Sequence, residues 1–317
     1  MKPKTPKNVA ASMRAKLLDR ARDRKEDFQF MLGRWVAERF LYRLGKSDQR
    51  EVFVLKGATL FLIWQGKLPR PTRDIDLLGY GSTQIKSVTE SIRQICSVAA
   101  DDGIVFDLAG ITAEEIREEA EYGGIRVRIP AALDGAKAPL QIDIGFGDAV
   151  DPAPEETAFP VMLDMESPRL KTYPPEVVIA EKLQAMVHLG IANSRMKDFF
   201  DIWILSREQP FQMSRLQRAV EATFARRKTP LPTERPTALT DAFLKDKAKT
   251  DQWKAFLNRM ELPKDLAELG EVGDAIAGFL MPVIEAVRVK RGDELEWSAK
   301  GPWTKAEAAK SAKPEKK

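Results

Sequence analysis

The sequence has almost none of the side chains that build zinc sites or disulfides. It contains one cysteine, Cys96, and one histidine, His188. A single cysteine excludes an internal disulfide and is typical of a reducing compartment, so we expect a cytoplasmic protein. A Cys/His zinc site is also excluded, so any metal would be held by oxygen ligands. No apolar run approaches the roughly 18 residues that span a bilayer, which predicts no membrane contact.

Charge is unevenly distributed along the 317 residues. Residues 1–25 carry +7 and residues 298–317 carry +4, so with a total of +4 the body from 26 to 297 carries −7. An acidic body excludes a general nucleic-acid-binding stripe. The last segment has the composition of a disordered basic tail. The alternative is a basic arm that gathers a polyanion by long-range attraction.

Apolar periodicity predicts an α+β chain. Helices are expected at 13–25 and 28–44. Strands at 104–108, 125–129 and 140–146, with an acidic helix at 113–121, precede a proline-rich connector at 152–175. From residue 176 onward the pattern is mostly helical, with helices expected at 176–189, 197–206, 213–226, 237–258 and 266–289. The predicted divisions are N-terminal helices at 1–48, a core at 49–160, a helical domain at 168–297 and the tail at 298–317.

Two aspartates, Asp74 and Asp76, stand one residue apart in the apolar run TRDIDLL at 72–78. In a strand, alternate side chains point to the same face, so both carboxylates would lie together on one side. Like charges this close repel unless a cation lies between them. The run therefore predicts a strand that presents two acids to a cation.

A third acid, Asp143, stands between two isoleucines in the strand-like run LQIDIGFGD. An acid among buried neighbours is costly unless it is paired or bound to a metal. Carboxylates from adjacent strands suit Mg²⁺ ions that bind a triphosphate and activate an attacking hydroxyl. Asp74, Asp76 and Asp143 are therefore predicted to form a magnesium site for phosphoryl transfer.

A glycine turn, KGAT at 56–59, precedes the acidic strand. Such a turn lets backbone N–H groups approach phosphates at the start of a helix. The turn, the Asp-x-Asp strand and the later acid resemble the nucleotidyltransferase superfamily of the DNA-polymerase-β type. That pattern usually has serine or glycine where this chain has Ala58, so backbone contacts or Thr59 would have to serve instead. The resemblance implies that an NTP contacts Lys56, Gly57, Ala58 and Thr59. Arg73 either steadies the triphosphate or is an ordinary loop arginine.

The segments FVLKGATLFLIW, RPTRDIDL, LQIDIGFGD, PPEVVIAEKLQAMV and RMKDFFDIWIL occur in this order. Together they resemble the AbiEii-type nucleotidyltransferase toxins, which include the MenT-like proteins, over roughly residues 10–290. The resemblance implies a bilobed fold, with a polymerase-β-type mixed-sheet lobe and a helical C-terminal lobe. It also implies Mg²⁺, an NTP substrate and a cognate antitoxin. For some members it implies nucleotide transfer to the 3′ end of tRNA.

Three residues of the helical region have a structural and a catalytic interpretation. Lys182 lies at the edge of an apolar helical stripe, where it is either a surface lysine or a cation for a phosphate. Asp198 and Asp201 share one face of an apolar helix. They form either a structural ion pair with Lys182, Arg195 or Lys197 or, as the resemblance implies, part of the active site with Lys182. Either acid could orient or deprotonate the acceptor hydroxyl, and Asp198 matches the family pattern better.

The sequence thus predicts a two-lobed, Mg²⁺-dependent nucleotidyltransferase that is the toxin of a toxin–antitoxin system. The catalytic residues would be Asp74, Asp76, Lys182, Asp198 and Asp201. An acceptor hydroxyl, by resemblance an RNA end such as that of tRNA, would attack the α-phosphorus of the NTP and release pyrophosphate. The alternatives are transfer to a protein hydroxyl and a non-catalytic module that holds nucleotide or RNA.

Overall fold

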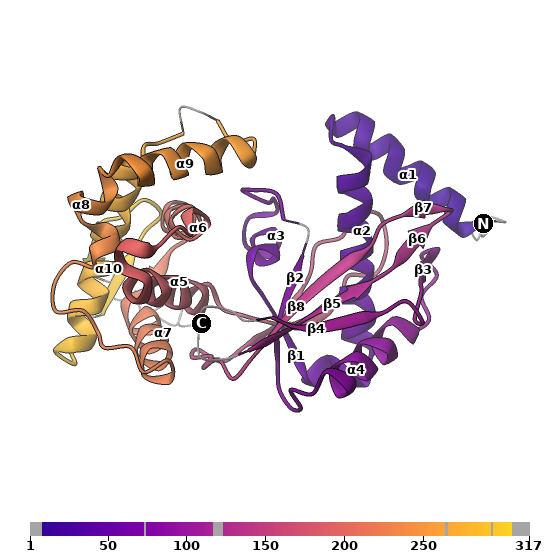
Figure 1. The fold of residues 1–317 in the computed structure, drawn as a ribbon, viewed down its shortest axis with the longest axis horizontal. Coiled ribbons are helices and arrows are strands. Elements are labelled where there is room, and N and C mark those ends of the chain that lie inside the picture. Colours follow the sequence, from indigo (N-terminus) through magenta and orange to yellow (C-terminus); the bar gives the residue numbers. More distant parts are fainter. Residues whose placement is uncertain (1–7, 73, 117–122, 264–265, 293, 306–317) are drawn as a thin grey trace, which may run out of the picture. The chain divides into compact units, whose positions relative to one another are not determined.

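The computed structural model describes residues 8–72, 74–116, 123–263, 266–292 and 294–305. The chain divides into two compact units, Met1–Pro174 and Pro175–Lys317 (Figure 1). The first unit combines helices with sheets, and the second is mostly helical. The predicted α+β class is therefore confirmed. No helix in the described ranges is long and apolar enough to cross a membrane.

A seven-stranded mixed sheet forms the centre of the first unit, in the order β4-β5-β8-β2-β1-β10-β9. Two neighbouring pairs, β1 with β10 and β2 with β8, are parallel, and the other pairs are antiparallel. Strands far apart in the sequence therefore lie side by side. The strands are β1 (Phe53–Lys56), β2 (Ile75–Gly79), β4 (Thr112–Ile116), β5 (Gly124–Ile129), β8 (Leu140–Phe146), β9 (Glu155–Ala158) and β10 (Arg169–Thr172).

Two N-terminal helices begin at side-chain caps and pack on this unit. Asn8 caps α1 (Val9–Arg24) by accepting from the Ala11 backbone N–H, and Asp27 caps α2 (Phe28–Lys46) in the same way. Helix α2 packs against β8 and β10, and α4 (Ile85–Ser97) packs against β4. The remaining elements are η1 (Asp48–Glu51), η2 (Ala58–Leu60), α3 (Phe61–Gln65), and a small sheet of β3 (Ile104–Phe106), β6 (Ala131–Leu133) and β7 (Ala136–Lys137).

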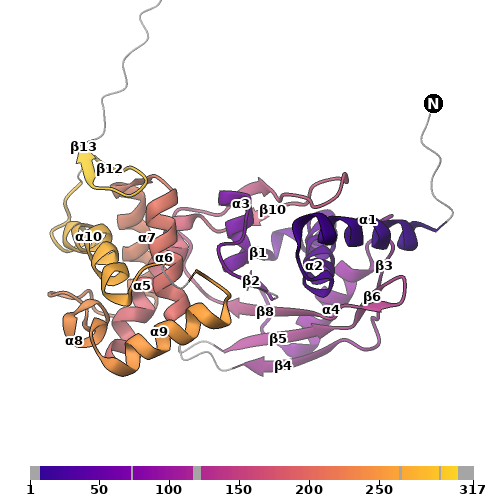
Figure 2. The ribbon, with the colours of Figure 1, turned by 90° about the horizontal axis from the view of Figure 1, so that it is seen from above.

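The second unit is a helical bundle with a small sheet at one end (Figure 2). Its main contacts join α5 to α7 and α10 to both α6 and α7. The helices are α5 (Pro175–Leu189), η3 (Gly190–Ala192), α6 (Met196–Glu208), α7 (Met213–Arg226), η4 (Thr237–Leu239), α8 (Asp241–Leu244), α9 (Lys247–Arg259) and α10 (Leu269–Arg288). The small sheet consists of β11 (Phe211–Gln212), β12 (Leu295–Trp297) and β13 (Trp303–Lys305).

Three sequence predictions are wrong because long-range contacts determine the local structure. A helix is expected at 113–121, but residues 112–116 form β4, where Glu114 pairs with Arg128 of β5 at 2.7 Å. The proline-rich connector contributes β9 and β10 to the large sheet. The single helix expected at 237–258 is divided, because Asp246 caps a new helix by accepting from Lys249 N.

The predicted disordered tail is also wrong for its first residues. Trp303 begins β13, stacks on Phe279 with ring centroids 5.8 Å apart and donates its Nε1–H to the Phe279 carbonyl oxygen. A buried aromatic contact of this kind holds the segment on α10. Residues 306–317 lie outside the described part of the chain.

Candidate active site

Four charged residues stand in one register across four adjacent strands of the large sheet. Lys56 on β1 is opposite Asp76 on β2, Asp76 is opposite Asp143 on β8, and Asp143 is opposite Arg126 on β5. Residues in register on neighbouring strands project from the same face of a sheet. The face therefore carries a charged row (Lys56, Asp76, Asp143 and Arg126) in which two acids lie side by side between two cations.

Apolar neighbours fix the strands that carry the charged row. Leu55, Leu77 and Ile144 alternate with the charged residues along their strands, and each side chain is completely buried. A slip of one residue in any strand would bury the charges and expose the apolar side chains. The alternation in the sequence therefore specifies the register that brings Asp76 and Asp143 together.

Gly57 follows β1 and has φ 77° and ψ −163°, a backbone conformation that residues other than glycine rarely adopt. A Cβ at this position would lie 2.0 Å from Oδ2 and 2.8 Å from Cβ of Asp76. The glycine turn therefore lies directly against the second acid of the Asp-x-Asp pair. Close approach, as well as the positive φ, requires glycine at this position.

Arg126 holds the carboxylate of Asp143 at two points. Its Nε donates to Oδ1 at 2.8 Å and its Nη2 donates to Oδ2 at 2.7 Å. The hydrogen bonds to Asp143 raise the pKa of Arg126, and the negative charges of Asp143, Asp74 and Glu114 raise it further. Asp74 therefore lies within electrostatic range of Arg126, and Asp143 already has a cation as its partner.

Lys56 extends across the same face to a further acid. Its Nζ donates to Oδ2 of Asp148 at 2.7 Å and lies 5.8 Å from the centre of the Tyr173 ring. A Cβ on Gly145 would lie 3.2 Å from Lys56 Nζ, so the lysine passes over β8 close to its backbone. Asp148 stands in the run LQIDIGFGD, but sequence reasoning did not single it out as a partner for Lys56.

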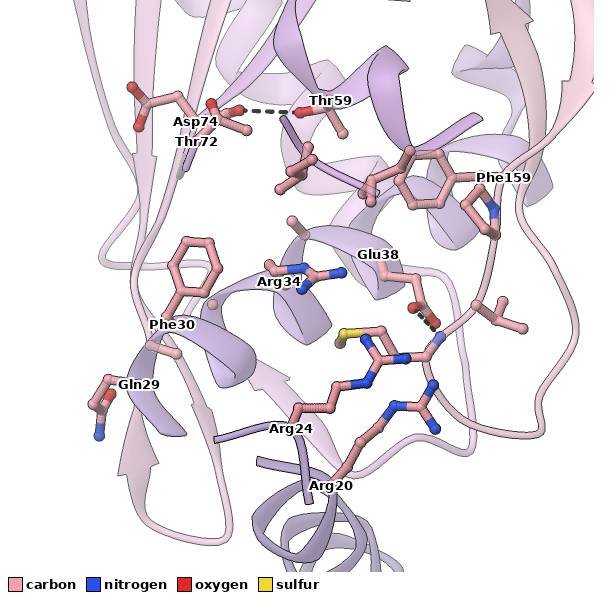
Figure 3. A pocket seen from close by; sticks show the side chains of 18 of the residues that line it. Arg20, Arg24, Gln29, Phe30, Arg34, Glu38, Thr59, Thr72, Asp74 and Phe159 are labelled. Atoms are coloured by element: carbon pink, nitrogen blue, oxygen red, sulfur yellow. Dashed lines mark hydrogen bonds between the residues drawn. The ribbon is translucent and has the colours of Figure 1, made fainter. Parts of the chain in front are cut away.

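Asp74 stands immediately before β2, and not inside the strand as the run TRDIDLL predicts. Thr59 Oγ1 donates to the Asp74 carbonyl oxygen at 3.4 Å (Figure 3). Ala58 and Thr59 are both buried, so the threonine hydroxyl supports the backbone of the first acid. Arg73, a predicted NTP contact, lies outside the described residues.

The predicted lysine and aspartates of the second unit form a buried ionic group. Lys182 Nζ lies 2.6 Å from Asp198 Oδ1 and 2.9 Å from Asp201 Oδ2, while Arg195 Nε lies 2.7 Å from Asp198 Oδ2. Interpreting Lys182 as a surface lysine is wrong, since its side chain is only 14% exposed. We call these four residues the lysine cluster.

Asp198 is a weak base despite complete burial. Burial alone would raise its pKa, but the positive charges of Lys182 and Arg195 and the hydrogen bond from Lys182 outweigh burial and lower the pKa. A carboxylate with a lowered pKa accepts a proton poorly. Its geometry suits it to hold Lys182 in position.

The described residues contain no ready-made group of three acidic, histidine or cysteine side chains that could hold a metal ion. The donor chemistry of the charged row nevertheless fits Mg²⁺, because this ion prefers carboxylate oxygens and the row places two acids side by side. At Asp143, Arg126 already supplies the positive charge.

The comparisons with known proteins agree with the motifs. A family model described as the nucleotidyl transferase AbiEii toxin of a type IV toxin–antitoxin system matches residues 39–277. The chain belongs to the AbiEii nucleotidyltransferase toxin family. This AbiEii protein is therefore a nucleotidyltransferase, and its family implies an antitoxin as partner. The resemblance predicted from the sequence is confirmed.

Two solved structures from Helicobacter pylori are similar to the AbiEii chain. JHP933 is 16% identical, with a TM-score of 0.46, and the match covers 83% of this chain and 95% of JHP933. A presumed nucleotidyltransferase is also 16% identical, with a TM-score of 0.47 and coverage of 84% and 99%. No curated protein matches the chain.

One feature near the acids was missed by sequence reasoning. A cavity of about 330 Å³ in the first unit is lined by three arginines, Arg20, Arg24 and Arg34, and reaches Asp74. We call it the arginine pocket. Arg20 and Arg24 are one helical turn apart, so their spacing was a usable signal. Sequence reasoning counted these two only as part of the basic N-terminal segment.

Proposed function

We propose that this AbiEii protein transfers a nucleoside monophosphate from an NTP to the 3′ hydroxyl of an RNA such as a tRNA. The observation that supports this most directly is the charged row, which places Asp76 beside Asp143 on adjacent parallel strands. The acceptor oxygen attacks the α-phosphorus, the bond from this phosphorus to the β-phosphate oxygen breaks, and pyrophosphate leaves.

Asp74, Asp76 and Asp143 are the residues that we assign to Mg²⁺. Such an ion neutralises phosphate charge and lowers the pKa of a bound hydroxyl. Since Arg126 pairs with Asp143 at both oxygens, Asp74 and Asp76 are the primary ligands in this proposal. Arg126 balances the third acid and keeps Asp143 from repelling its neighbour.

The NTP is assigned to the turn from Lys56 to Thr59, with Arg73 as a further contact. Gly57 exposes backbone against Asp76, because no side chain can stand at that point. Lys56 is the cation of the charged row that belongs to this turn. Asp148 holds its ammonium group through a hydrogen bond. A cation fixed in this way suits a phosphate oxygen.

The lysine cluster is assigned to the same reaction. Lys182 supplies positive charge to a phosphate, and Asp198 orients it through a hydrogen bond of 2.6 Å. Because the pKa of Asp198 is lowered, we assign the deprotonation of the acceptor hydroxyl to Asp201 rather than to Asp198. This choice differs from the family-based preference for Asp198.

The acceptor is tested by incubating the protein with NTP labelled at the α-phosphate, purified tRNA and a protein extract. Transfer to RNA requires a free 3′ hydroxyl, so tRNA with an oxidised 3′ diol is the matched control. We expect label on intact tRNA only. Label on a protein band and never on RNA would contradict the RNA acceptor and favour transfer to a protein hydroxyl.

A further inference from the structure

The arginine pocket has an acid at one end and a cluster of cations at the other. Figure 3 shows Asp74 and Thr59 at one end, Arg20 and Arg24 at the opposite end, and Arg34 with Glu38 between them. All of these residues lie in the first unit. The pocket therefore links the first predicted catalytic acid to a site with positive charge.

The three arginines of the pocket have few ion pairs and hydrogen bonds with other described residues. Arg20 and Arg24 make no ion pair among the residues described, and Nε of both Arg20 and Arg34 is buried without a hydrogen-bond partner. The only acid paired with Arg34 among those residues is Glu26, at 3.4 Å. Burial lowers the pKa of Arg34, and the charges of Arg24 and Arg20 lower it further. Such crowded guanidinium groups favour an anion between them.

The rest of the lining suits the apolar parts of a nucleotide. Phe30, Leu62, Leu68, Phe159 and Met162 provide aromatic and aliphatic surface. Bases stack on aromatic rings, and arginine binds phosphate oxygens in pairs. At about 330 Å³ the cavity lies at the small end of the roughly 300–1,000 Å³ of small-molecule sites. It is therefore large enough for one nucleotide unit of a strand.

Most of the lining lies outside the residues assigned to the NTP and to Mg²⁺. The pocket shares Thr59 and Asp74 with them, but its lining includes none of Gly57, Asp76 and Asp143. A ligand in the pocket would therefore reach the catalytic acids from the side of Asp74, while the turn at Gly57 faces Asp76. The acceptor is the reactant that remains for the pocket.

We propose that the arginine pocket binds the terminal nucleotide of the RNA acceptor, with Arg20, Arg24 and Arg34 on its phosphate. This assignment rests on the proposed transfer to RNA and adds the residues that capture the RNA end. It places acceptor recognition on the N-terminal helices α1 and α2.

The test measures binding of a short, fluorescently labelled single-stranded RNA by anisotropy, without NTP or Mg²⁺, at several salt concentrations. The variants are Arg24→Ala and Arg34→Ala. Arg22→Ala is the matched control, because Arg22 lies on the same helix, is exposed and contacts Asp19 rather than the pocket. Binding of NTP is measured in parallel, and thermal unfolding confirms that each variant is folded.

Each pocket variant should bind the RNA about tenfold more weakly or worse, as expected for the loss of a charge-assisted hydrogen bond. The slope of log Kd against log salt should fall by about 0.7 per arginine. Arg22→Ala should have a much smaller effect, and NTP binding should not change in any variant. Equal RNA binding by pocket variants and the control would overturn the inference, as would weaker NTP binding with RNA binding intact.

A transfer assay at limiting tRNA separates this inference from the proposed function. If wild type and pocket variants label tRNA equally well, transfer to RNA stands and the pocket assignment is wrong. If wild type labels only protein, the proposed acceptor is wrong, and the pocket assignment falls with it. Reduced labelling by Arg24→Ala, restored at high tRNA concentration, supports both.

Discussion

Replacing Gly57 with alanine should damage both stability and activity, because position 57 is constrained in two independent ways. Its φ of 77° and ψ of −163° lie in a region that costs a side chain of order 1–3 kcal/mol. The new Cβ would also lie 2.6 Å from Cγ and 2.8 Å from Cβ of Asp76. The backbone of strand β2 fixes the position of the Asp76 Cβ, so relief of this contact requires a shift of the strand or of the turn.

The overlap should add about 1–3 kcal/mol, the usual cost of forcing extra atoms into a packed region. We therefore expect Gly57→Ala to lower the free energy of unfolding by about 2–6 kcal/mol. Gly135→Ala is the matched control, since Gly135 has φ 78° and a Cβ added there would have no neighbouring atom within 4 Å. It should cost only about 1–2 kcal/mol, from its backbone conformation alone.

The assay is urea unfolding of both variants, with nucleotidyl transfer measured on the folded protein. Displacement of Asp76 should lower the transfer rate in Gly57→Ala by far more than in Gly135→Ala. Equal losses of stability in the two variants, with the wild-type transfer rate kept in Gly57→Ala, would show that contact with Asp76 does not constrain Gly57.

Three further substitutions test the charges described above. Lys182→Met should lower the free energy of unfolding by about 3–5 kcal/mol, since it leaves two buried acids without their shared cation. Because Asp198 has a lowered pKa, this loss should diminish as pH falls below about 3.8, and a pH-independent loss contradicts the ion-pair account. Burial raises the pKa of Glu38 from 4.5 to about 7, because it favours the protonated side chain. The resulting contribution to the free energy of unfolding is complete below pH 4.5 and is lost as the pH rises through 7. Urea titrations should therefore show that the free energy of unfolding of Glu38→Gln rises by about 3 kcal/mol relative to that of wild type between pH 4.5 and pH 7. A difference that stays constant between these pH values would contradict a raised pKa of Glu38. Arg126→Gln removes the cation from Asp143, so calorimetry should show Mg²⁺ binding about tenfold more tightly, and weaker binding contradicts a metal site on this face.

Local patterns predicted several elements well because their apolar spacing agrees with their final surroundings. Strand β8 and helix α7 have the predicted bounds. The alternation around Asp143 indicated a strand with one charged face, and the structure has Ile142 and Ile144 completely buried. Helical spacing placed Asp198 and Asp201 on one face of their helix, and the structure has Lys182 in contact with both.

The charged row could not be predicted from local patterns. The row forms because β8 lies between β2 and β5 in the sheet. This strand order brings residues 76, 126 and 143 side by side, although they are far apart in the sequence. No periodicity encodes the order of strands in a sheet, and pairing of β4 with β5 likewise overrode the helical propensity of an acidic segment. The arginine pocket was missed for a similar reason, since it combines α1 and α2 with a turn near Asp74.

In the proposed function, the Asp-x-Asp pair beside Asp143 carries nucleotidyl transfer to RNA. The most direct measurement compares label transfer from α-labelled NTP to tRNA by wild type, Asp76→Asn and Asp134→Asn. Asp134 is the matched control, because it lies in the turn between β6 and β7 at φ 47°, which asparagine tolerates. We expect labelled tRNA with wild type and Asp134→Asn, and none with folded Asp76→Asn. Full labelling by Asp76→Asn would overturn the assignment of these acids to the reaction.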